Sequence, residues 1–294
     1  MSVSLRCYST SLGCPKNRVD TERLLGSLGV ALVPVESPDE AELVFINTCA
    51  FIQPATEESV RTIAQAIADI EELPKRPLLA VAGCLVGRYH AEDLAPELPE
   101  VDLWLDNSDL EAWPAMLARK LGLPEPTVPG RILSTGPSYA WLKISDGCRH
   151  ACSFCAIPNI RGGHRSHCKD MIVREARALL DQGVKELNLV AQDLTEWGCD
   201  LDGKQDLRTL LDGLLPLQGL ERLRLMYLYP AGMTHEMLKY LREAGKPFVP
   251  YFDVPVQHSH PDVLSRMGRP FARNPREAID RIRNVFPEAA LRTS

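Results

Sequence analysis

The sequence predicts an α/β protein with two domains, each built from parallel strands that alternate with helices. Short apolar runs alternate with amphipathic segments along most of the chain, which is the pattern of repeated strand–helix–strand units. Residues 123–138 interrupt this alternation with four prolines and two glycines, a composition typical of a segment between domains. We therefore place the first domain at residues 1–122, a linker at 123–138 and the second domain at 139–294.

The first domain is predicted to be a small doubly wound α/β domain. Its strands are expected at five apolar runs, residues 4–11, 31–35, 43–47, 78–82 and 101–105. Amphipathic segments at residues 19–28 and 55–70 repeat apolar side chains at helical spacing, so helices are expected there. This order of elements favours a parallel sheet with helices on its faces.

The second domain is predicted to be a βα barrel or an open βα sheet. Strands are expected at residues 140–145, 186–191, 222–228 and 249–254, and helices at residues 170–182, 207–214, 235–244 and 275–285. Residues 289–294 begin a fifth strand, and the sequence stops there. A complete barrel is therefore not expected.

Composition and charge limit the classes of function. The chain of 294 residues is 45% hydrophobic and 24% charged, as expected of a globular protein with a buried core. Its net charge of -6 argues against a protein that mainly neutralises phosphates; the basic stretch 161–169 could steer a macromolecular partner or could be a solvated loop. The sequence shows neither a membrane-spanning run nor a signal peptide, so we expect a cytoplasmic protein without a membrane partner.

Nine cysteines without a secretory signal favour metal ligation or thiol chemistry over disulfides. Cys148, Cys152 and Cys155 form a Cys-x3-Cys-x2-Cys triplet directly after the first predicted strand of the second domain. Three thiolates in one loop can bind three irons of a four-iron cluster and leave the fourth iron open for chemistry. Zinc is the alternative, but a structural zinc site would need a fourth ligand, which would have to be His150, His164, His167 or Cys168.

This triplet, with Phe154 just before its last cysteine, resembles the defining motif of radical S-adenosylmethionine (radical SAM) enzymes. The resemblance implies that the methionine part of S-adenosylmethionine chelates the open iron. It further implies that an electron from the cluster breaks a sulfur–carbon bond of the cofactor, and that the resulting 5′-deoxyadenosyl radical abstracts hydrogen from the substrate. On this resemblance the three cysteines are catalytic and Phe154 lies at the cofactor.

Cys14, Cys49 and Cys84 form a second triplet, because each follows a predicted strand of the first domain. Loops at the carboxyl ends of parallel strands converge on one edge of a sheet, so the three thiols can meet around one cluster. Gly13 and Gly83 precede two of them and allow a sharp turn with room for a bulky group. Any one of these cysteines alone could be a small buried side chain, but three together favour ligation.

The segments SLGCPKN, NTCAF and GCL around these cysteines, followed by the radical SAM triplet, resemble the methylthiotransferases. The resemblance implies a flavodoxin-like N-terminal domain followed by an incomplete radical-SAM βα barrel. It also implies two 4Fe-4S clusters and S-adenosylmethionine as cofactors. The cluster on Cys148, Cys152 and Cys155 would make the radical, and the cluster of the first domain would present sulfur to the substrate.

Three segments, SLGCPKN and residues 191–198 and 251–258, are similar to the RimO type of methylthiotransferase, which modifies an aspartate β-carbon on a small-subunit ribosomal protein. The resemblance implies cofactor contacts by Gln192, Asp193 and Gln257, whereas polar residues at strand ends can also act as caps without a ligand. It implies the ribosomal protein or the ribosome as partner and a flavodoxin or ferredoxin as electron donor. The sulfur donor is not identified by the sequence.

Two departures from the family keep alternatives open. The segment HRSHC, residues 164–168, stands where Arg-Ser-Arg-Pro is usual, and we expect the chain to lack the last barrel units and the TRAM domain that family members carry. The alternatives are a tRNA methylthiotransferase of the MiaB type and an iron–sulfur-binding fragment without catalysis. Cofactor cleavage would separate an enzyme from a fragment, and the modified macromolecule would separate the two enzymes.

Overall fold

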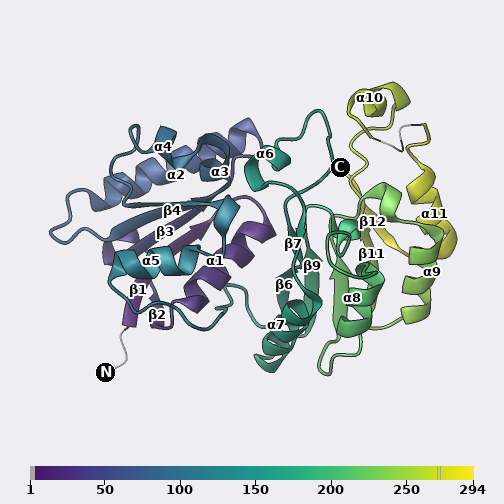
Figure 1. Cartoon of the computed structure of the whole chain (residues 1–294), viewed down its shortest axis with the longest axis horizontal. Coiled ribbons are helices and arrows are strands. Elements are labelled where there is room, and N and C mark those ends of the chain that lie inside the picture. Colours follow the sequence, from purple (N-terminus) through teal and green to yellow (C-terminus); the bar gives the residue numbers. More distant parts are fainter. Residues whose placement is uncertain (1–3, 270, 272) are drawn as a thin grey trace. The chain divides into compact units, whose positions relative to one another are not determined.

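The computed structural model describes residues 4–269, 271 and 273–294, and the chain divides into two compact units. The first unit holds residues up to 134 together with Asn159–Arg161, and the second holds Thr135–Pro158 and Gly162–Ser294. The predicted α/β class is confirmed, because both units contain a parallel sheet covered by helices (Figure 1).

The first unit contains a five-stranded parallel sheet with the order β2-β1-β3-β4-β5. Its strands are β1 (Ser4–Ser11), β2 (Ala31–Pro34), β3 (Leu43–Thr48), β4 (Leu78–Gly83) and β5 (Leu103–Asp106). This strand order is the one found in flavodoxin-like folds. It places β3 in the centre, and every residue of β3 is buried, as expected for a parallel strand with helices on both faces.

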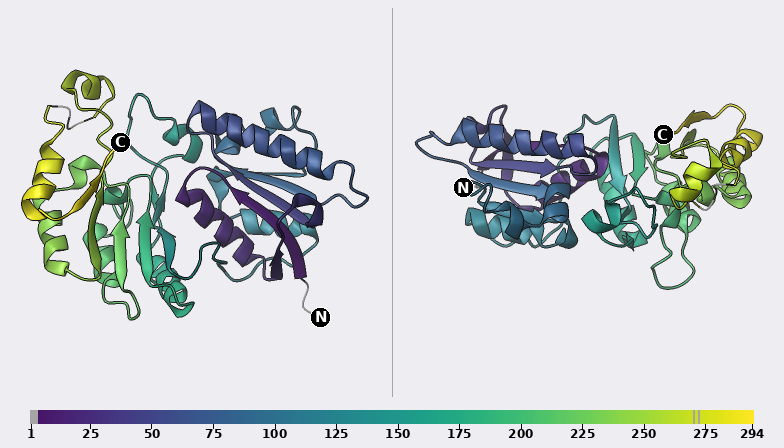
Figure 2. Two further views of the ribbon diagram at one scale, coloured as in Figure 1. Left: turned by 180° about the vertical axis from the view of Figure 1, so that it is seen from behind. Right: turned by 90° about the horizontal axis from the view of Figure 1, so that it is seen from above.

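Helices lie on both faces of this sheet, as the two views of Figure 2 show. The helices of the unit are α1 (Pro15–Ser27), α2 (Gln53–Ile70), α3 (Cys84–Tyr89), α4 (Ala91–Leu94) and α5 (Trp113–Leu121). On one face, Leu24 of α1 and Trp113 of α5 pack in a single apolar cluster with Leu5 and Phe45 of the sheet. Alternate residues of β3 and β4 face this cluster, which is the two-residue period of a strand.

A buried ion pair holds residues 123–134, part of the expected linker, against α1. Arg131 Nη2 lies 2.7 Å from Glu22 Oε2, and the two side chains are only 5% and 2% exposed. The other oxygen of Glu22 accepts hydrogen bonds from the backbone and hydroxyl of Ser134. Gly26 meets this segment so closely that an added Cβ would lie 2.5 Å from the Arg131 backbone. Residues 123–134 are therefore packed as part of the first unit, while residues 135–138 belong to the second.

The second unit contains an open five-stranded parallel sheet with the order β12-β11-β10-β9-β6. The strands are β6 (Tyr139–Lys143), β9 (Glu186–Val190), β10 (Arg222–Leu225), β11 (Phe248–Asp253) and β12 (Ala290–Arg292). All neighbours pair in parallel, so each strand runs in the same direction across the sheet. The short strands β7 (Ser145–Asp146) and β8 (Arg165–Ser166) form a separate antiparallel pair.

Helices connect the strands of the second sheet in sequence order. They are α7 (Lys169–Asp181), α8 (Leu207–Leu214), α9 (His235–Ala244), α10 (Pro261–Arg266) and α11 (Glu277–Val285). The helix α6 (Ile157–Arg161) begins in the second unit and ends in the first. None of the helices in the described part of the chain is both long enough and apolar enough to cross a membrane.

Replacing Glu22 with Gln should destabilise the first unit, because it leaves the Arg131 guanidinium buried without its anion. Loss of one partner of a buried pair costs about 3–5 kcal/mol, and chemical denaturation followed by circular dichroism would measure the difference. Lys75→Ala is the matched control, since it removes an exposed ion pair with Glu42 in the same unit and should cost less than about 1 kcal/mol. Equal losses in the two variants would contradict a special role for the buried pair.

Candidate functional site

The first cysteine triplet lies at the carboxyl edge of the first sheet. Cys14 precedes α1, Cys49 follows the central strand β3, and Cys84 is the first residue of α3 directly after β4. Strands β1, β3 and β4 are neighbours in the sheet, so the loops that follow them share one edge. Cys49 and Cys84 are buried and Cys14 is partly buried.

Two glycines let these loops approach each other. Gly13 has a φ of +81°, and an added Cβ would lie 2.7 Å from Cys49 Sγ. Gly83 has a φ of +101°, and an added Cβ would lie 2.6 Å from the backbone oxygen of Thr48. Both positions combine a left-handed backbone with contact to the β3 loop, so any larger residue would be strained and would push the cysteine loops apart.

Asn17, in the first turn of α1, links the three loops by hydrogen bonds. Its Nδ2 donates to the backbone oxygens of Leu12 and Thr48, at 2.9 and 2.8 Å. Its Oδ1 lies 3.8 Å from Cys84 Sγ, close enough for a weak hydrogen bond from the thiol. Sequence reasoning did not select Asn17, although it is the last residue of the quoted segment SLGCPKN.

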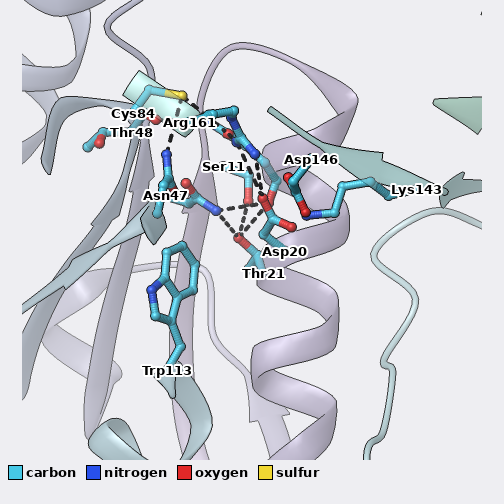
Figure 3. A network of polar contacts seen from close by, with 12 residues as sticks. Ser11, Asp20, Thr21, Asn47, Thr48, Cys84, Trp113, Lys143, Asp146 and Arg161 are labelled. Atoms are coloured by element: carbon cyan, nitrogen blue, oxygen red, sulfur yellow. Dashed lines mark hydrogen bonds and ion pairs between the residues drawn. The ribbon is translucent and has the colours of Figure 1, made fainter. Parts of the chain in front are cut away.

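Arg161 completes a buried polar network beside Asn17. Its guanidinium donates to Asn17 Oδ1 and lies 3.3 Å from Asp20 Oδ2, and both ionic side chains are 2% exposed. Figure 3 shows Asp20, Thr21 and Asn47 gathered beside Arg161; Asn47 Nδ2 donates to the Thr21 hydroxyl. The network therefore places a paired positive charge near the first triplet.

The electrostatic environment differs among the thiols of this triplet. Burial alone would raise the pKa of Cys14, but the charges of Lys16 and Arg161 and backbone N–H donors at the start of α1 outweigh it and lower that pKa. Burial raises the pKa of Cys49, and the neighbouring Cys84 and Cys14 raise it further. Cys14 and Cys84 therefore both lie within electrostatic range of Cys49.

This arrangement fits an iron–sulfur cluster better than three separate structural thiols. Thiolates are the protein ligands of such clusters, and Gly13, directly before Cys14, carries no side chain that would collide with Cys49 Sγ. A nearby cation and helix N–H groups favour the negative charge of a thiolate-bound cluster.

The second triplet lies in one loop after strand β7. Cys148, Cys152 and Cys155 are each partly buried, and the Cys155 backbone N–H donates to the Cys152 oxygen. The loop is anchored at the end of α10, where the Ser153 backbone N–H donates to the Met267 oxygen and its hydroxyl donates to the Arg266 oxygen. The three thiols are therefore held at one site without help from another strand.

Burial and mutual repulsion disfavour free thiolates in this loop. Burial raises the pKa of Cys148 to about 11, and the charges of Asp193 and the two other cysteines act in the same direction. Burial also raises the pKa of Cys152, with Cys155 adding to the effect and Arg269 opposing it. A cationic metal centre would remove this penalty, because it neutralises the charges that repel one another.

His150 and Asp193 form a contact beside this loop. His150 Nε2 lies 2.6 Å from Asp193 Oδ2, and the His150 ring stacks on Tyr229 with centroids 4.0 Å apart. The other oxygen of Asp193 accepts from the backbone and hydroxyl of Thr195. Asp193 thus fixes the orientation of His150, whose backbone N–H lies 3.4 Å from Cys148 Sγ. Sequence reasoning considered His150 only as a zinc ligand, and no spacing rule would have paired it with Asp193.

The remaining residues expected at the cofactor differ in their surroundings. Gln192 follows β9, and both polar atoms of its side-chain amide are buried without a hydrogen-bond partner among the described residues. Phe154 is 43% exposed and lies under the Arg269 guanidinium, 5.5 Å from the ring centroid. Gln257 has a φ of +79° and donates its backbone N–H to the Ser294 oxygen. The unsatisfied amide of Gln192 fits a polar ligand best, since an unpaired buried amide is costly.

Two family models match the chain. Residues 6–106 match UPF0004, described as an uncharacterized protein family, and residues 142–293 match the radical SAM superfamily. Each match lies within one sequence-predicted domain and contains one of the cysteine triplets.

The chain is also similar to curated proteins named ribosomal protein uS12 methylthiotransferase RimO. It is 69% identical over 287 residues to that of Nitratidesulfovibrio vulgaris, covering 98% of this chain and 67% of the relative. It is 62% identical over 294 residues to that of Lawsonia intracellularis, covering 100% of this chain and 67% of the relative. The chain therefore spans about two thirds of the length of these relatives.

A solved structure shares the fold at low sequence identity. The radical SAM methyltransferase TsrM from Kitasatospora setae, with cobalamin and a [4Fe-4S] cluster bound, aligns with a TM-score of 0.66 and 14% identity. The alignment covers 100% of this chain and 66% of TsrM. The likeness concerns the arrangement of the α/β elements alone.

Gly13→Ala should disrupt the first triplet, because the new Cβ would overlap Cys49 in a backbone region that disfavours alanine. Backbone strain of about 1 kcal/mol and overpacking of about 1–3 kcal/mol predict a total loss of about 2–4 kcal/mol in the free energy of unfolding. Gly29→Ala is the matched control, since Gly29 also has a positive φ (+68°) but has nothing within 4 Å of the added Cβ. Denaturation curves that coincide for the two variants would count against the close approach.

Proposed function

Because the chain belongs to the family of ribosomal protein uS12 methylthiotransferases named RimO, within the radical SAM superfamily, we propose that it adds a methylthio group to an aspartate β-carbon of uS12. The observation that carries this proposal is the presence of two separate cysteine triplets. One lies at the carboxyl edge of the first unit's sheet, and the other lies in the loop after β7 of the second unit. One cluster site would suffice for radical chemistry alone. A second one fits the delivery of sulfur.

In this proposal Cys148, Cys152 and Cys155 hold a 4Fe-4S cluster with one iron open to S-adenosylmethionine. When bound, this cluster supplies the electron that cleaves a sulfur–carbon bond of the cofactor. The chain's own contribution is to hold the loop rigid, through Ser153 at the end of α10, and to keep His150 oriented by Asp193. Rigid placement matters because a radical reacts with whatever atom lies nearest.

Gln192 is the residue of the second unit best suited to bind the cofactor. Its buried amide offers one donor group and one acceptor oxygen that no described residue uses. These are the groups needed to recognise the amino and carboxylate ends of the methionine moiety or the ribose hydroxyls. Asp193 would position His150. In the same region, Phe154 would form an apolar part of the wall and Gln257 a polar part.

Cys14, Cys49 and Cys84 would hold the second 4Fe-4S cluster, which supplies the sulfur to be transferred. Asn17 ties the three loops together, and Arg161 places a positive charge near Cys14. Both features stabilise an anionic group at this edge of the sheet. They would hold the sulfur-bearing site in one geometry during repeated turnover.

The proposed reaction needs partners besides S-adenosylmethionine. The macromolecular substrate is the small-subunit ribosomal protein uS12, free or in the ribosome, and the reaction needs an electron donor such as a flavodoxin or ferredoxin. It also needs a sulfur donor. These partners place the reaction in the cytoplasm, where ribosomal proteins are made.

Replacing either cysteine triplet with alanine should remove one cluster and leave the other. Anaerobic reconstitution of the unaltered chain should give about eight irons, and each triple variant about four, because the sites lie in different units. Iron and sulfide analysis with electron paramagnetic resonance of the reduced protein would measure this. Cys7→Ala is the control and should keep all the iron. Iron near four in the unaltered chain, lost with one triplet only, would show that one triplet is not a cluster site.

Methylthio transfer should be seen when the reconstituted chain is incubated with S-adenosylmethionine, a reductant, sulfide and uS12. Mass spectrometry of uS12 would detect the modified aspartate, and chromatography would detect 5′-deoxyadenosine. Gln192→Ala should lower cofactor cleavage by at least about tenfold, whereas the surface variant Lys239→Ala should not change it. Cofactor cleavage with modification of tRNA in place of uS12 would overturn the substrate assignment. Absence of any cleavage would favour a fragment without catalysis.

A further inference from the structure

Outside both triplets, the second unit contains a group of three different metal-binding side chains. His164, Cys199 and Asp200 each place one ligand atom within 4.8 Å of the other two. His164 precedes the short strand β8, whereas the other two lie in the loop that follows the turn Leu194–Glu196. The cluster is therefore formed by two segments that are distant in sequence and adjacent in space.

We propose that His164, Cys199 and Asp200 form a binding site for a divalent transition metal, with zinc as the metal that best suits the donors. Imidazole nitrogen, thiolate sulfur and carboxylate oxygen are the three ligand types that zinc takes in proteins. The site is separate from the cluster cysteines in sequence and draws on none of them. Cys199 and His164 had no role in the reaction proposed above.

The geometry of the pair His164 and Asp200 fits shared coordination better than a direct contact. Nε2 of His164 lies 3.6 Å from Oδ1 of Asp200, which is longer than a hydrogen bond. Two ligands bound to zinc at about 2.0–2.2 Å in a tetrahedral arrangement lie roughly 3.3–3.6 Å apart. A metal ion placed between these two atoms would therefore need little movement of either.

Burial and second contacts hold two of the ligands in place. The His164 side chain is 3% exposed, and Asp200 Oδ2 accepts the backbone N–H of Ser166 at 2.8 Å, which directs Oδ1 toward His164. Carboxylates that bind metals are typically held in this way by a hydrogen bond to their second oxygen. The Ser166 hydroxyl, 3.0 Å from His164 Nε2, would give up that contact on metal binding.

The charges around the site favour a dication. Burial lowers the pKa of His164 and so favours the neutral imidazole, the form that binds metal, although the charge of Asp200 opposes this shift. Burial raises the pKa of Cys199, and Glu196 and Asp200 add to this, while Arg149 opposes it. The carboxylates that disfavour a free thiolate would attract a cation, and Arg149 is itself paired with Glu196 at 2.6 Å.

A bound metal would fasten the segment before β8 to the loop after the turn Leu194–Glu196. Asp193, which orients His150 beside the second triplet, lies at the other end of that turn, directly before Leu194. The site would thus act as a structural clamp on the turn that follows Asp193. The inference does not depend on methylthio transfer, because it concerns metal binding alone.

The test uses the reconstituted chain with about eight irons already bound, so that the cluster cysteines are occupied. Zinc sulfate is added in slight excess, weakly held metal is removed on a desalting column, and zinc and iron are measured by mass spectrometry. The unaltered chain and the control Cys168→Ser, an exposed cysteine outside the group, should each retain one zinc. Cys199→Ser and Asp200→Asn should lose it, with iron unchanged.

Zinc-edge X-ray absorption identifies the ligands. The expected spectrum has one sulfur neighbour at about 2.3 Å and nitrogen or oxygen neighbours at about 2.0–2.2 Å. Retention of zinc by Cys199→Ser, or a spectrum with three or four sulfurs, would place the metal outside this group of three residues and overturn the proposal. Failure of the unaltered chain to retain zinc would overturn it as well.

Discussion

The common direction of the strands within each sheet is the constraint on which the rest of the structure depends. In a parallel sheet the polypeptide returns to the same end before each strand, so every loop after a strand emerges at one edge. In the first unit this brings together Cys14, Cys49 and Cys84 from three loops. In the second unit it places Gln192 and Asp193 after β9, in the same half of the unit as the triplet loop that Asp193 supports through His150. An antiparallel arrangement would send alternate loops to opposite ends.

Strand direction alone does not fix the sulfur positions. Hydrogen bonds from the buried side-chain amide of Asn17 also hold the cysteine loops in place. Asn17 binds the backbone after β1 and after β3, and it lies next to Cys84 after β4. Each of those bonds replaces a contact with water, so its net contribution is about 1 kcal/mol, but the loss of Asn17 would leave several buried groups unpaired. The positive φ of Gly13 has a similar role, because it allows the loop after β1 to pass directly against Cys49. The first triplet is therefore part of the packing of its unit.

The elements and the cysteines could be predicted from the sequence because their signals are local. Apolar runs predicted the strands to within a few residues; the run at 222–228, for example, extends past β10, which ends at Leu225. The motifs around the cysteines identified the family, and the ligand role of the two triplets stays a prediction.

Partners that are distant in sequence had no such signal. The ion pair of Glu22 and Arg131 joins residues 109 apart and draws most of the expected linker into the first unit. The contact of His150 with Asp193 spans 43 residues, and only the packing of the two loops decides which polar groups meet.

Cys14 and Cys148 lie in different electrostatic environments, although we propose the same kind of metal centre for both triplets. Lys16, Arg161 and the start of α1 lower the pKa of Cys14 despite its burial, whereas burial raises the pKa of Cys148 to about 11. Since iron binds the thiolate, each ligand must lose its proton before or during assembly. Where fixed positive charges already stabilise a thiolate, the charge of the metal adds less stabilisation. Where burial favours the neutral thiol, the charge of the metal adds more. Cys14 would therefore lose its proton more readily than Cys148 as the pH rises.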